Sequence, residues 1–227
     1  MNKPAAVLWM VAALLLPCAP ACAADVPVPR NYGDAMRWYE RAAEAGNAEA
    51  QFYLGVLYET GVRGPDLATA ADWFRRAAEQ GHLEAQIKLA QAYLQGRGVS
   101  RDVGEAARWF RAAAAAGSAE AQYNMGVLHE RGLGVPPDAG EAVKWYERAS
   151  DGGLAQARLN LSLIYAMGNG VEPSPVTAYM WLKMANDSGL RVSEAYREDL
   201  ARQLTPEEIA AAEREAHERL SASGEPR

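Results

Sequence analysis

Residues 35–46 read Ala-Met-Arg-Trp-Tyr-Glu-Arg-Ala-Ala-Glu-Ala-Gly, and variants of this stretch recur four more times along the chain. Its tryptophan returns after 35, 36, 36 and 36 residues, as Trp38, Trp73, Trp109, Trp145 and Trp181. A glycine follows each tryptophan at the eighth position, as Gly46, Gly81, Gly117, Gly153 and Gly189. A period of this length is typical of helix–turn–helix units that bury their apolar faces only by stacking. The spacing therefore predicts an all-α fold, an α/α solenoid in which helix pairs form a superhelix.

Polar residues and glycines mark where the helices of each unit begin and end. The residue seven positions before each tryptophan is a good N-cap, as Asn31, Asp66, Asp102, Asp138 and Ser174. Glu105 and Glu141 follow two of these caps by three residues, which predicts capping boxes. The glycine at the eighth position is a left-handed helix stop, so the first helix is expected near residues 32–45. Asn47 and Ser118 can then cap the second helices of their units.

The tryptophan column is expected to form the interior of the stack. At about 100° per residue, the tryptophan and the residues at −3, +1, +4 and +8 share one arc of the first helix. The −3 and +4 positions are alanine in every repeat, as in Ala106 and Ala113 around Trp109. Small residues let a neighbouring helix approach a bulky ring. We therefore expect all five tryptophans to be buried and, with the five glycines, to define the repeat core.

The recurring columns combine into the pattern A-x-x-W-Y-x-x-A-A-x-x-G, followed by A-x-x-x-L-G-x-x-Y-x-x-G-x-G-V. In the first unit the second half is carried by Ala50, Leu54, Gly55, Tyr58 and Gly61. In this pattern the chain resembles the Sel1-like repeat family, a relative of the tetratricopeptide repeats, over about residues 31–173 and the first helix of a fifth unit. The resemblance implies that first helices line a concave surface. It also implies a secreted or periplasmic bacterial protein whose relatives act as adaptors in envelope assembly, polysaccharide export, signalling and host contact.

The two ends of the chain differ from the repeats. Residues 1–24 carry Lys3, an apolar run and small residues, which predicts a cleaved signal peptide and a periplasmic or secreted protein with no stable membrane insertion. An uncleaved N-terminal anchor that holds the protein in the periplasm is the alternative. Near the other end, the residues 205–208, Thr-Pro-Glu-Glu, predict a helix start. An apolar stripe follows, and we expect this helix to close the solenoid; the stripe is Ile209, Ala212, Ala216 and Leu220.

These observations divide the chain into predicted segments. They are a signal peptide (1–24), a linker (25–30), four repeats (31–65, 66–101, 102–137 and 138–173), a degenerate fifth repeat with a capping helix (174–220), and a disordered tail (221–227).

No recognisable catalytic or metal-binding motif is present in the sequence. His82, His129 and His217 have no second His, Cys or acid at a metal-ligand spacing. Neither a Gly-x-Ser-x-Gly nor a Ser-x-x-Lys motif occurs. The formal net charge of −6 argues against nonspecific nucleic-acid binding. We therefore predict a non-enzymatic protein without a cofactor or a metal.

The face opposite the buried arc carries the positions −1, +2, +3 and +6 from each tryptophan. In most repeats these positions hold charges that can pair within the same helix, which is consistent with a solvated, self-neutralised face. In the third repeat Arg108 and Arg111 have no acid within this stripe, and Ala112 and Ala115 follow. In the fifth repeat methionines interrupt the pattern, either as adaptable contacts or because the closing helix covers them. The predicted partner-binding residues are Arg75, Arg108, Arg111, Met180 and Met184.

The leading functional hypothesis is a non-catalytic scaffold of the bacterial cell envelope that binds an acidic or amphipathic segment of a protein partner in the groove of the stack. Binding of peptidoglycan or another envelope polysaccharide is the alternative, although the aromatic columns are expected on the buried arc. A β-lactam-binding or β-lactam-hydrolysing enzyme is a third, less favoured hypothesis. The partner itself is not specified by the sequence.

Overall fold

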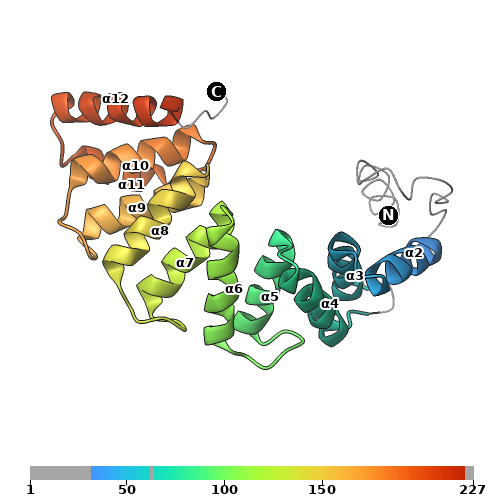
Figure 1. Ribbon diagram of the computed structural model, residues 1–227. Helices are drawn as coiled ribbons and strands as arrows, with labels where there is room; N and C mark the ends of the chain where they lie inside the picture. The colour runs from blue at the N-terminus through green and yellow to red at the C-terminus, as the bar shows by residue number, and fades with distance from the viewer. Residues whose placement is uncertain (1–31, 62–63, 223–227) are drawn as a thin grey trace. The chain divides into compact units, whose positions relative to one another are not determined.

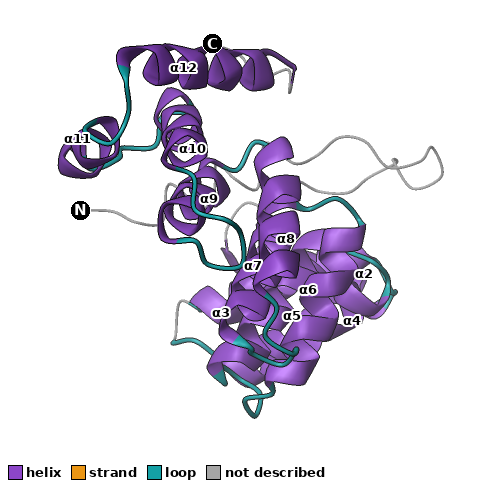
Figure 2. Ribbon diagram, turned by 90° about the vertical axis from the view of Figure 1, so that its left-hand side faces the viewer, coloured by secondary structure: helices purple, strands orange, loops and turns teal. Residues whose placement is uncertain are grey.

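The computed structural model describes residues 32–61 and 64–222, and over these ranges the chain forms helices and no strand (Figure 1; Figure 2). The chain divides into two compact units, with the boundary between His82 and Leu83. The described part of the first unit contains α2 (Tyr32–Glu44), α3 (Ala48–Thr60) and α4 (Leu67–Glu79). Within this unit α3 packs against both α2 and α4. The core buried around α2 and α3 consists of Tyr39, Ala43, Ala50 and Leu54.

The second unit contains the remaining helices. They are α5 (Leu83–Gln95), α6 (Val103–Ala115), α7 (Ala119–Arg131), α8 (Ala139–Asp151), α9 (Ala155–Met167), α10 (Pro175–Asp187), α11 (Glu194–Ala201) and α12 (Pro206–Ala222). From α5 to α10 each helix packs on the next one along the chain, most extensively where a second helix meets the first helix of the following repeat. Every helix from α2 to α10 is 13 residues long. This regularity confirms the predicted all-α solenoid of helix–turn–helix repeats.

Within the described residues, the helices begin and end at the predicted caps and glycines. The side chains of six predicted caps accept a hydrogen bond from a first-turn N–H, namely Asn47, Asp66, Asp102, Ser118, Asp138 and Ser174. Asn31 lies outside the described residues. The five glycines at the eighth position have φ between 85° and 92°, the left-handed region that a side chain would disfavour. α2 spans Tyr32–Glu44, close to the expected residues 32–45.

Of the two hydrogen bonds that define a capping box, only one forms at Glu105 and at Glu141, so the prediction of complete boxes there is wrong. The N–H of Glu105 donates to the Asp102 carboxylate over 3.0 Å, as a capping box requires. The Glu105 carboxylate, however, pairs with Arg108 instead of reaching back to the backbone of the cap. The reason is that the N–H of Asp102 already donates to the carbonyl oxygen of Tyr93 over 3.0 Å. Glu141 behaves in the same way and pairs with Lys144.

That backbone hydrogen bond recurs in every described connector between a second helix and the following first helix. The N–H of the N-cap donates to the carbonyl of the residue at +20 in the preceding repeat, over 2.9–3.0 Å. The pairs are Asp66 with Tyr58, Asp102 with Tyr93, Asp138 with His129, and Ser174 with Tyr165. Each connector is therefore fixed by main-chain atoms.

The most deeply buried large side chain of each first helix follows the tryptophan and is not the tryptophan itself. These neighbours are Tyr39, Phe74, Phe110, Tyr146 and Leu182, each at most 8% exposed. Trp109 and Trp181 are also buried, but Trp38, Trp73 and Trp145 are only partly buried. The expectation that all five indole rings lie in the interior is therefore wrong for three of them, although Trp38 and Trp73 still pack against the core of the first unit.

Two glycines of the second helices allow close approach of a ring from the next first helix. A Cβ atom on Gly126 would lie 2.6 Å from Cε1 of Tyr146, and a Cβ on Gly55 would lie 2.6 Å from Cε1 of Phe74. Ordinary carbon–carbon contacts are about 3.5–4.0 Å. In these two helix pairs a Cβ at the glycine position would therefore force the ring to shift.

A fully buried arginine replaces glutamine in the fourth repeat. In α3 the side-chain amide of Gln51 donates to the carbonyl of Ala43 over 3.1 Å. At the equivalent position of α9, Arg158 donates to the carbonyl of Ser150 over 2.8 Å, to the Ser150 hydroxyl over 3.1 Å, and to the hydroxyl of Ser188. Ser150 and Ser188 lie at the C-terminal ends of α8 and α10. The guanidinium thus lies at two helix C-termini, where a positive charge is favoured.

The C-terminal end of the second unit departs from the repeat pattern, as predicted. α11 has only eight residues, and α12 packs against α10. The capping box of α12 is complete, because the N–H of Thr205 donates to the Glu208 carboxylate over 2.8 Å and the N–H of Glu208 donates to the Thr205 hydroxyl over 3.3 Å. The predicted stripe of α12 faces the core, with Ala212 and Ala216 fully buried.

Candidate partner-binding face

Arginine side chains lie against the indole rings of four repeats. The guanidinium carbons of Arg76, Arg108 and Arg148 lie 4.4, 4.3 and 4.7 Å from the ring centroids of Trp73, Trp109 and Trp145, each within one helix. In the fifth repeat the arginine is supplied by α12, with Arg219 at 5.2 Å from the Trp181 ring. Sequence reasoning missed these contacts. The first three could have been found, because the arginine stands one residue before or three residues after the tryptophan.

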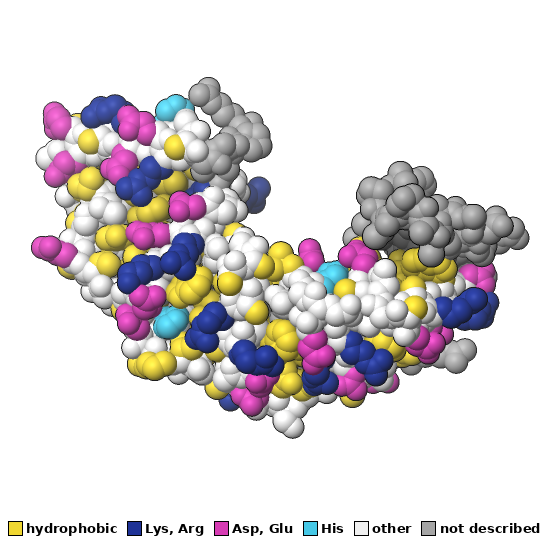
Figure 3. Space-filling view, in the orientation of Figure 1, with side chains coloured by type: hydrophobic (Ala, Val, Ile, Leu, Met, Phe, Trp, Pro, Cys, Tyr) yellow, Lys and Arg dark blue, Asp and Glu magenta, His cyan; other side chains and the backbone are white. Residues whose placement is uncertain are grey.

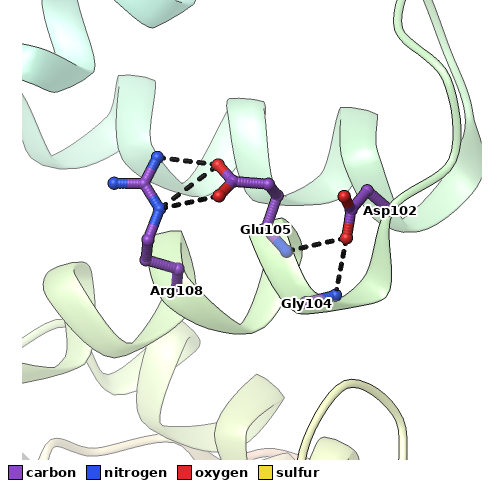
Figure 4. A network of polar contacts seen from close by, with 4 residues as sticks. All are labelled: Asp102, Gly104, Glu105 and Arg108. Carbon is purple, nitrogen blue, oxygen red and sulfur yellow. Dashed lines mark hydrogen bonds and ion pairs between the residues drawn. The ribbon is translucent and has the colours of Figure 1, made fainter.

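The outward face of α6 is the most informative of the predicted positions. Arg108 pairs with Glu105, with Nη2 2.7 Å from Oε2, and the same carboxylate accepts from Nε (Figure 4). The outward stripe of α6 contains no acid, as expected, but Arg108 still has an acidic partner because Glu105 lies one helical turn earlier, outside that stripe. Glu105 and the indole of Trp109 together orient the guanidinium.

Arg111 lies one turn further along α6 and is exposed. Its side chain forms no hydrogen bond or ion pair with any residue in 32–61 or 64–222. Ala112 and Ala115 beside it are also exposed. In the equivalent stripe of α8, Lys144 pairs with Glu141 over 2.6 Å. Figure 3 shows basic and acidic side chains interspersed over the visible surface, with apolar side chains between them.

The three remaining residues predicted to bind a partner, Arg75, Met180 and Met184, do not lie on an exposed face together with Arg108 and Arg111. Arg75 belongs to α4 of the first unit, where it is half-buried and pairs with Asp72 over 2.5 Å. Met180 and Met184 of α10 are 2% and 3% exposed and belong to the same buried cluster as Ala212 and Ala216 of α12. They are not surface residues, because the closing helix covers this side of α10. The alternative reading of the two methionines is therefore the correct one.

One carboxylate lies close to the outward face but is partly withdrawn from water. Burial raises the pKa of Glu147 in α8, although the charge of Arg219 opposes the shift. Burial, and then the charge of Glu147, raise the pKa of the Tyr165 hydroxyl in α9. Glu147, Tyr165 and Arg219 therefore influence one another electrostatically where α8, α9 and α12 come together.

The histidines do not combine into a site. His82 stacks on Phe52 with ring centroids 4.6 Å apart, and its Nε2 lies 3.1 Å from Oε2 of Glu49. His129 is half-buried in α7 and His217 is exposed on α12. In the part of the chain that the structure describes, no three His, Cys, Asp or Glu residues are grouped so that they could hold a metal ion. None of the helices formed by these residues is long and apolar enough to span a bilayer.

The repeats match a known family along most of the chain. The model of the Sel1 repeat matches residues 25–47, 48–82, 83–118, 119–154 and 155–190. The chain belongs to the Sel1 repeat family. The last four of the five matched Sel1 units begin at a second helix, half a repeat away from the units that the tryptophan spacing suggests, and so follow the most extensive helix–helix contacts. One matched boundary, between residues 82 and 83, coincides with the boundary between the two compact units.

Solved structures of bacterial Sel1 repeat proteins are similar to this chain. A Sel1 repeat protein from Oxalobacter formigenes is 35% identical with a TM-score of 0.64, and the match covers 68% of this chain and 62% of that one. A protective antigen of uropathogenic Escherichia coli strains, which displays an SLR fold, is 29% identical with a TM-score of 0.53. That match covers 86% of this chain and 50% of the antigen. The chain thus spans 62% and 50% of the lengths of these two relatives. No curated protein matches the chain.

Sel1 repeats generally mediate protein–protein interactions and are generally non-catalytic. This property belongs to the family as a whole. The two solved relatives extend beyond the part that this chain matches. The partner and the binding surface of this Sel1 repeat protein must therefore be argued from its own residues.

Proposed function

We propose that this chain is a non-catalytic scaffold of the bacterial cell envelope, which binds a segment of a partner protein on the outward face of α6. The observation that carries the proposal is the environment of Arg111. It is an exposed cation without a carboxylate partner in the described residues, and it lies beside exposed Ala112 and Ala115. A surface of this kind favours a partner that supplies a carboxylate and a small apolar contact.

Arg108 supports the same choice of partner. Its guanidinium is already oriented by Glu105 and by the Trp109 ring, so little side-chain entropy remains to be lost on binding. Glu105 already occupies the Nε and Nη2 edge of this guanidinium, so a partner carboxylate would share Arg108 with Glu105 or displace it. We therefore expect the partner segment to be acidic or amphipathic, with a carboxylate near Arg111 and a second near Arg108. Arg75 of α4 is a separate candidate for a carboxylate contact within the first unit.

The proposed envelope location rests on residues 1–24, which lie outside the described residues but have the charge and apolar pattern of a secretory signal. Fusion of residues 1–30 to alkaline phosphatase, which is active only after export, tests this part of the proposal. Phosphatase activity is the expected result. An inactive fusion that remains in the cytoplasm would contradict it.

The binding face is tested by charge reversal. The variant Arg108→Glu/Arg111→Glu should retain its helicity and should capture crosslinked partners from an envelope extract about 3- to 30-fold less efficiently, as expected for two partly exposed charges. The control Arg131→Glu/Arg191→Glu changes the net charge equally, at exposed positions outside this face, and should capture as the wild type does. Equal capture by all three proteins would show that α6 is not the binding face.

A further inference from the structure

The face of α10 that α12 covers differs in chemistry from the same face of the other first helices. One residue before and three residues after the tryptophan, α6 has Arg108 and Ala112, and α8 has Lys144 and Arg148, all exposed. At these two positions α10 has methionines, and both are buried. We call Met180, Trp181 and Met184 of α10 the helix seat. At its two methionine positions the seat is apolar and buried, whereas the same positions of α6 and α8 are solvated.

α12 occupies the helix seat as a small amphipathic ligand would. Ala212 and Ala216, one turn apart, are fully buried in the cluster that contains the seat, and Ile209 and Leu220 pack against the edges of the cluster. Arg219 lies over the ring of Trp181 at 5.2 Å. In α6 and α8 the indole is covered by an arginine of the same helix. In α10 both candidate positions are methionine, so the arginine must come from another segment.

The attachment of α12, a helix of 17 residues, is chiefly to α10, on which it packs as extensively as α6 packs on α7. Only Ala212 and Ala216 of α12 are fully buried, and an alanine side chain offers a single methyl group. α10 is the only helix on which α12 packs extensively within the described residues. The polar contact between the Tyr179 hydroxyl and Glu213 is long, at 3.5 Å. The seat therefore buries much larger side chains than the helix that covers it.

We propose that the helix seat is a docking site for an amphipathic helix of a partner protein, and that α12 is its built-in competitor. This inference rests on the proposed function because it requires a protein partner. The surface it involves, however, is different from the face of α6. The partner helix has small residues at two positions four apart, an arginine or lysine three residues after the second, and a large apolar residue next to that cation. This is the pattern of Ala212, Ala216, Arg219 and Leu220.

Charge also favours a basic residue at the end of the docked helix. Glu147 of α8 is partly buried and interacts with the charge of Arg219. Glu215 of α12 pairs with Arg219 over 2.7 Å within the helix. A partner cation that replaced Arg219 would therefore lie over the Trp181 ring and within the field of the Glu147 carboxylate, which gives the site a preference beyond apolar contact.

A peptide with the sequence of residues 205–222, labelled with fluorescein, serves as the probe for the full-length chain. The variant Ala212→Asp/Ala216→Asp places two charges on the buried face of α12 and should release it. The control Ala210→Asp/Ala211→Asp places the same charges on the exposed face of the same helix. We expect the peptide to bind the first variant at least about 10-fold more tightly than it binds the wild type or the control, because the tethered competitor has been removed. A peptide with Arg219→Glu should bind that variant at least about 3-fold more weakly.

Equal affinity for the variant, the control and the wild type, or no binding to any of them, would overturn the proposal. Hydrogen exchange of the wild type gives a second test that does not depend on a variant folding. The amides of α12 should exchange at least about 10-fold faster than those of α10, by separate opening, and equal protection would show that α12 is a permanent part of the core. If light scattering showed a wild-type dimer whose fraction rises with concentration, the proposal of a separate partner protein would be wrong, and the occupant of the helix seat would be a second copy of this chain. Failure of the α6 charge-reversal test would leave these results unaffected.

Discussion

Replacing Gly126 with alanine tests the packing between α7 and α8 most directly. A methyl group on Gly126 would lie 2.6 Å from Cε1 and 2.7 Å from Cδ1 of Tyr146. The ring cannot move aside easily, because it is fully buried, its hydroxyl donates to Glu130 over 2.6 Å, and Tyr123 lies against it with centroids 5.5 Å apart. Overpacking of this kind costs about 1–3 kcal/mol. The gain from alanine over glycine inside a helix is about 1 kcal/mol, so Gly126→Ala should lower the free energy of unfolding by up to about 2 kcal/mol.

The matched control is Gly140→Ala in the first turn of α8. There the nearest atom to an added Cβ is Oδ1 of Asp138 at 3.4 Å, an ordinary contact. With no overpacking, only the helix-propensity gain remains, so the free energy of unfolding should rise by about 0.5–1 kcal/mol. The assay is urea unfolding of both variants and the wild type, followed by far-ultraviolet circular dichroism. The two substitutions are expected to change stability in opposite directions.

A double-mutant cycle identifies the ring as the cause. The pair α9 and α10 has Ser162 and Leu182 at the positions of Gly126 and Tyr146, and the pair α5 and α6 has Ala90 and Phe110. A Cβ is therefore accommodated opposite side chains that lack the hydroxyl by which Tyr146 is held to Glu130. Tyr146→Leu should therefore be less destabilising in the Gly126→Ala background than alone, with a coupling of at least about 1 kcal/mol. If Gly126→Ala stabilised the protein as much as Gly140→Ala, or if the cycle showed no coupling, the argument that the ring requires glycine would be wrong.

Two further predictions concern buried polar groups. Arg158→Met should lower the free energy of unfolding by about 2–4 kcal/mol, because it leaves the buried polar atoms of Ser150 without their donor. Arg158→Gln should cost less in the same urea assay, since glutamine makes the equivalent bond in α3, and equal losses would contradict this account. Glu147 has a raised folded-state pKa, so stability falls as the pH rises through that value and the carboxylate becomes charged. Glu147→Gln should therefore raise Tm relative to the wild type at pH 7 but not at pH 3, and a gain independent of pH would refute this assignment.

The repeat architecture could be predicted because its signals are local. Asp102 caps α6 and Gly117 ends the turn after it through atoms that lie within a few residues of one another. Spacing alone is sufficient to detect such features. The same holds for the closing helix, where Thr205 and Glu208 cap each other as their sequence predicts.

The depth of burial could not be predicted in the same way. A helical arc of about 100° or more includes both its centre and its edges, so the sequence placed Trp145 and Tyr146 together on the apolar side. Only the position of the neighbouring helix leaves Trp145 partly exposed and Tyr146 fully buried. The burial of Met180 likewise depends on α12, which lies about 30 residues further along the chain.

The candidate site shows a similar division. That Arg108 is exposed follows from its register on α6, but its pairing with Glu105 joins two different stripes of that helix, so the outward stripe alone does not predict it. Arg158 could be recognised as an unusual residue in a glutamine column. Its partners, however, come from α8 and α10 and include a hydroxyl 30 residues away. Interactions that involve three helices can be predicted only when the relative positions of those helices are known.

The connectors suggest how this chain could tolerate insertions and deletions. The first connector places its cap, Asp66, eight residues after Tyr58, whereas the later connectors place theirs nine residues after the acceptor, as Asp102 follows Tyr93. The same main-chain bond closes both lengths, at 2.9 and 3.0 Å. No side chain takes part in that bond. A substitution of the acceptor residue, such as His129 in place of tyrosine, therefore leaves the hydrogen bond between neighbouring repeats intact. Gain or loss of a single codon there need not disturb the helices on either side.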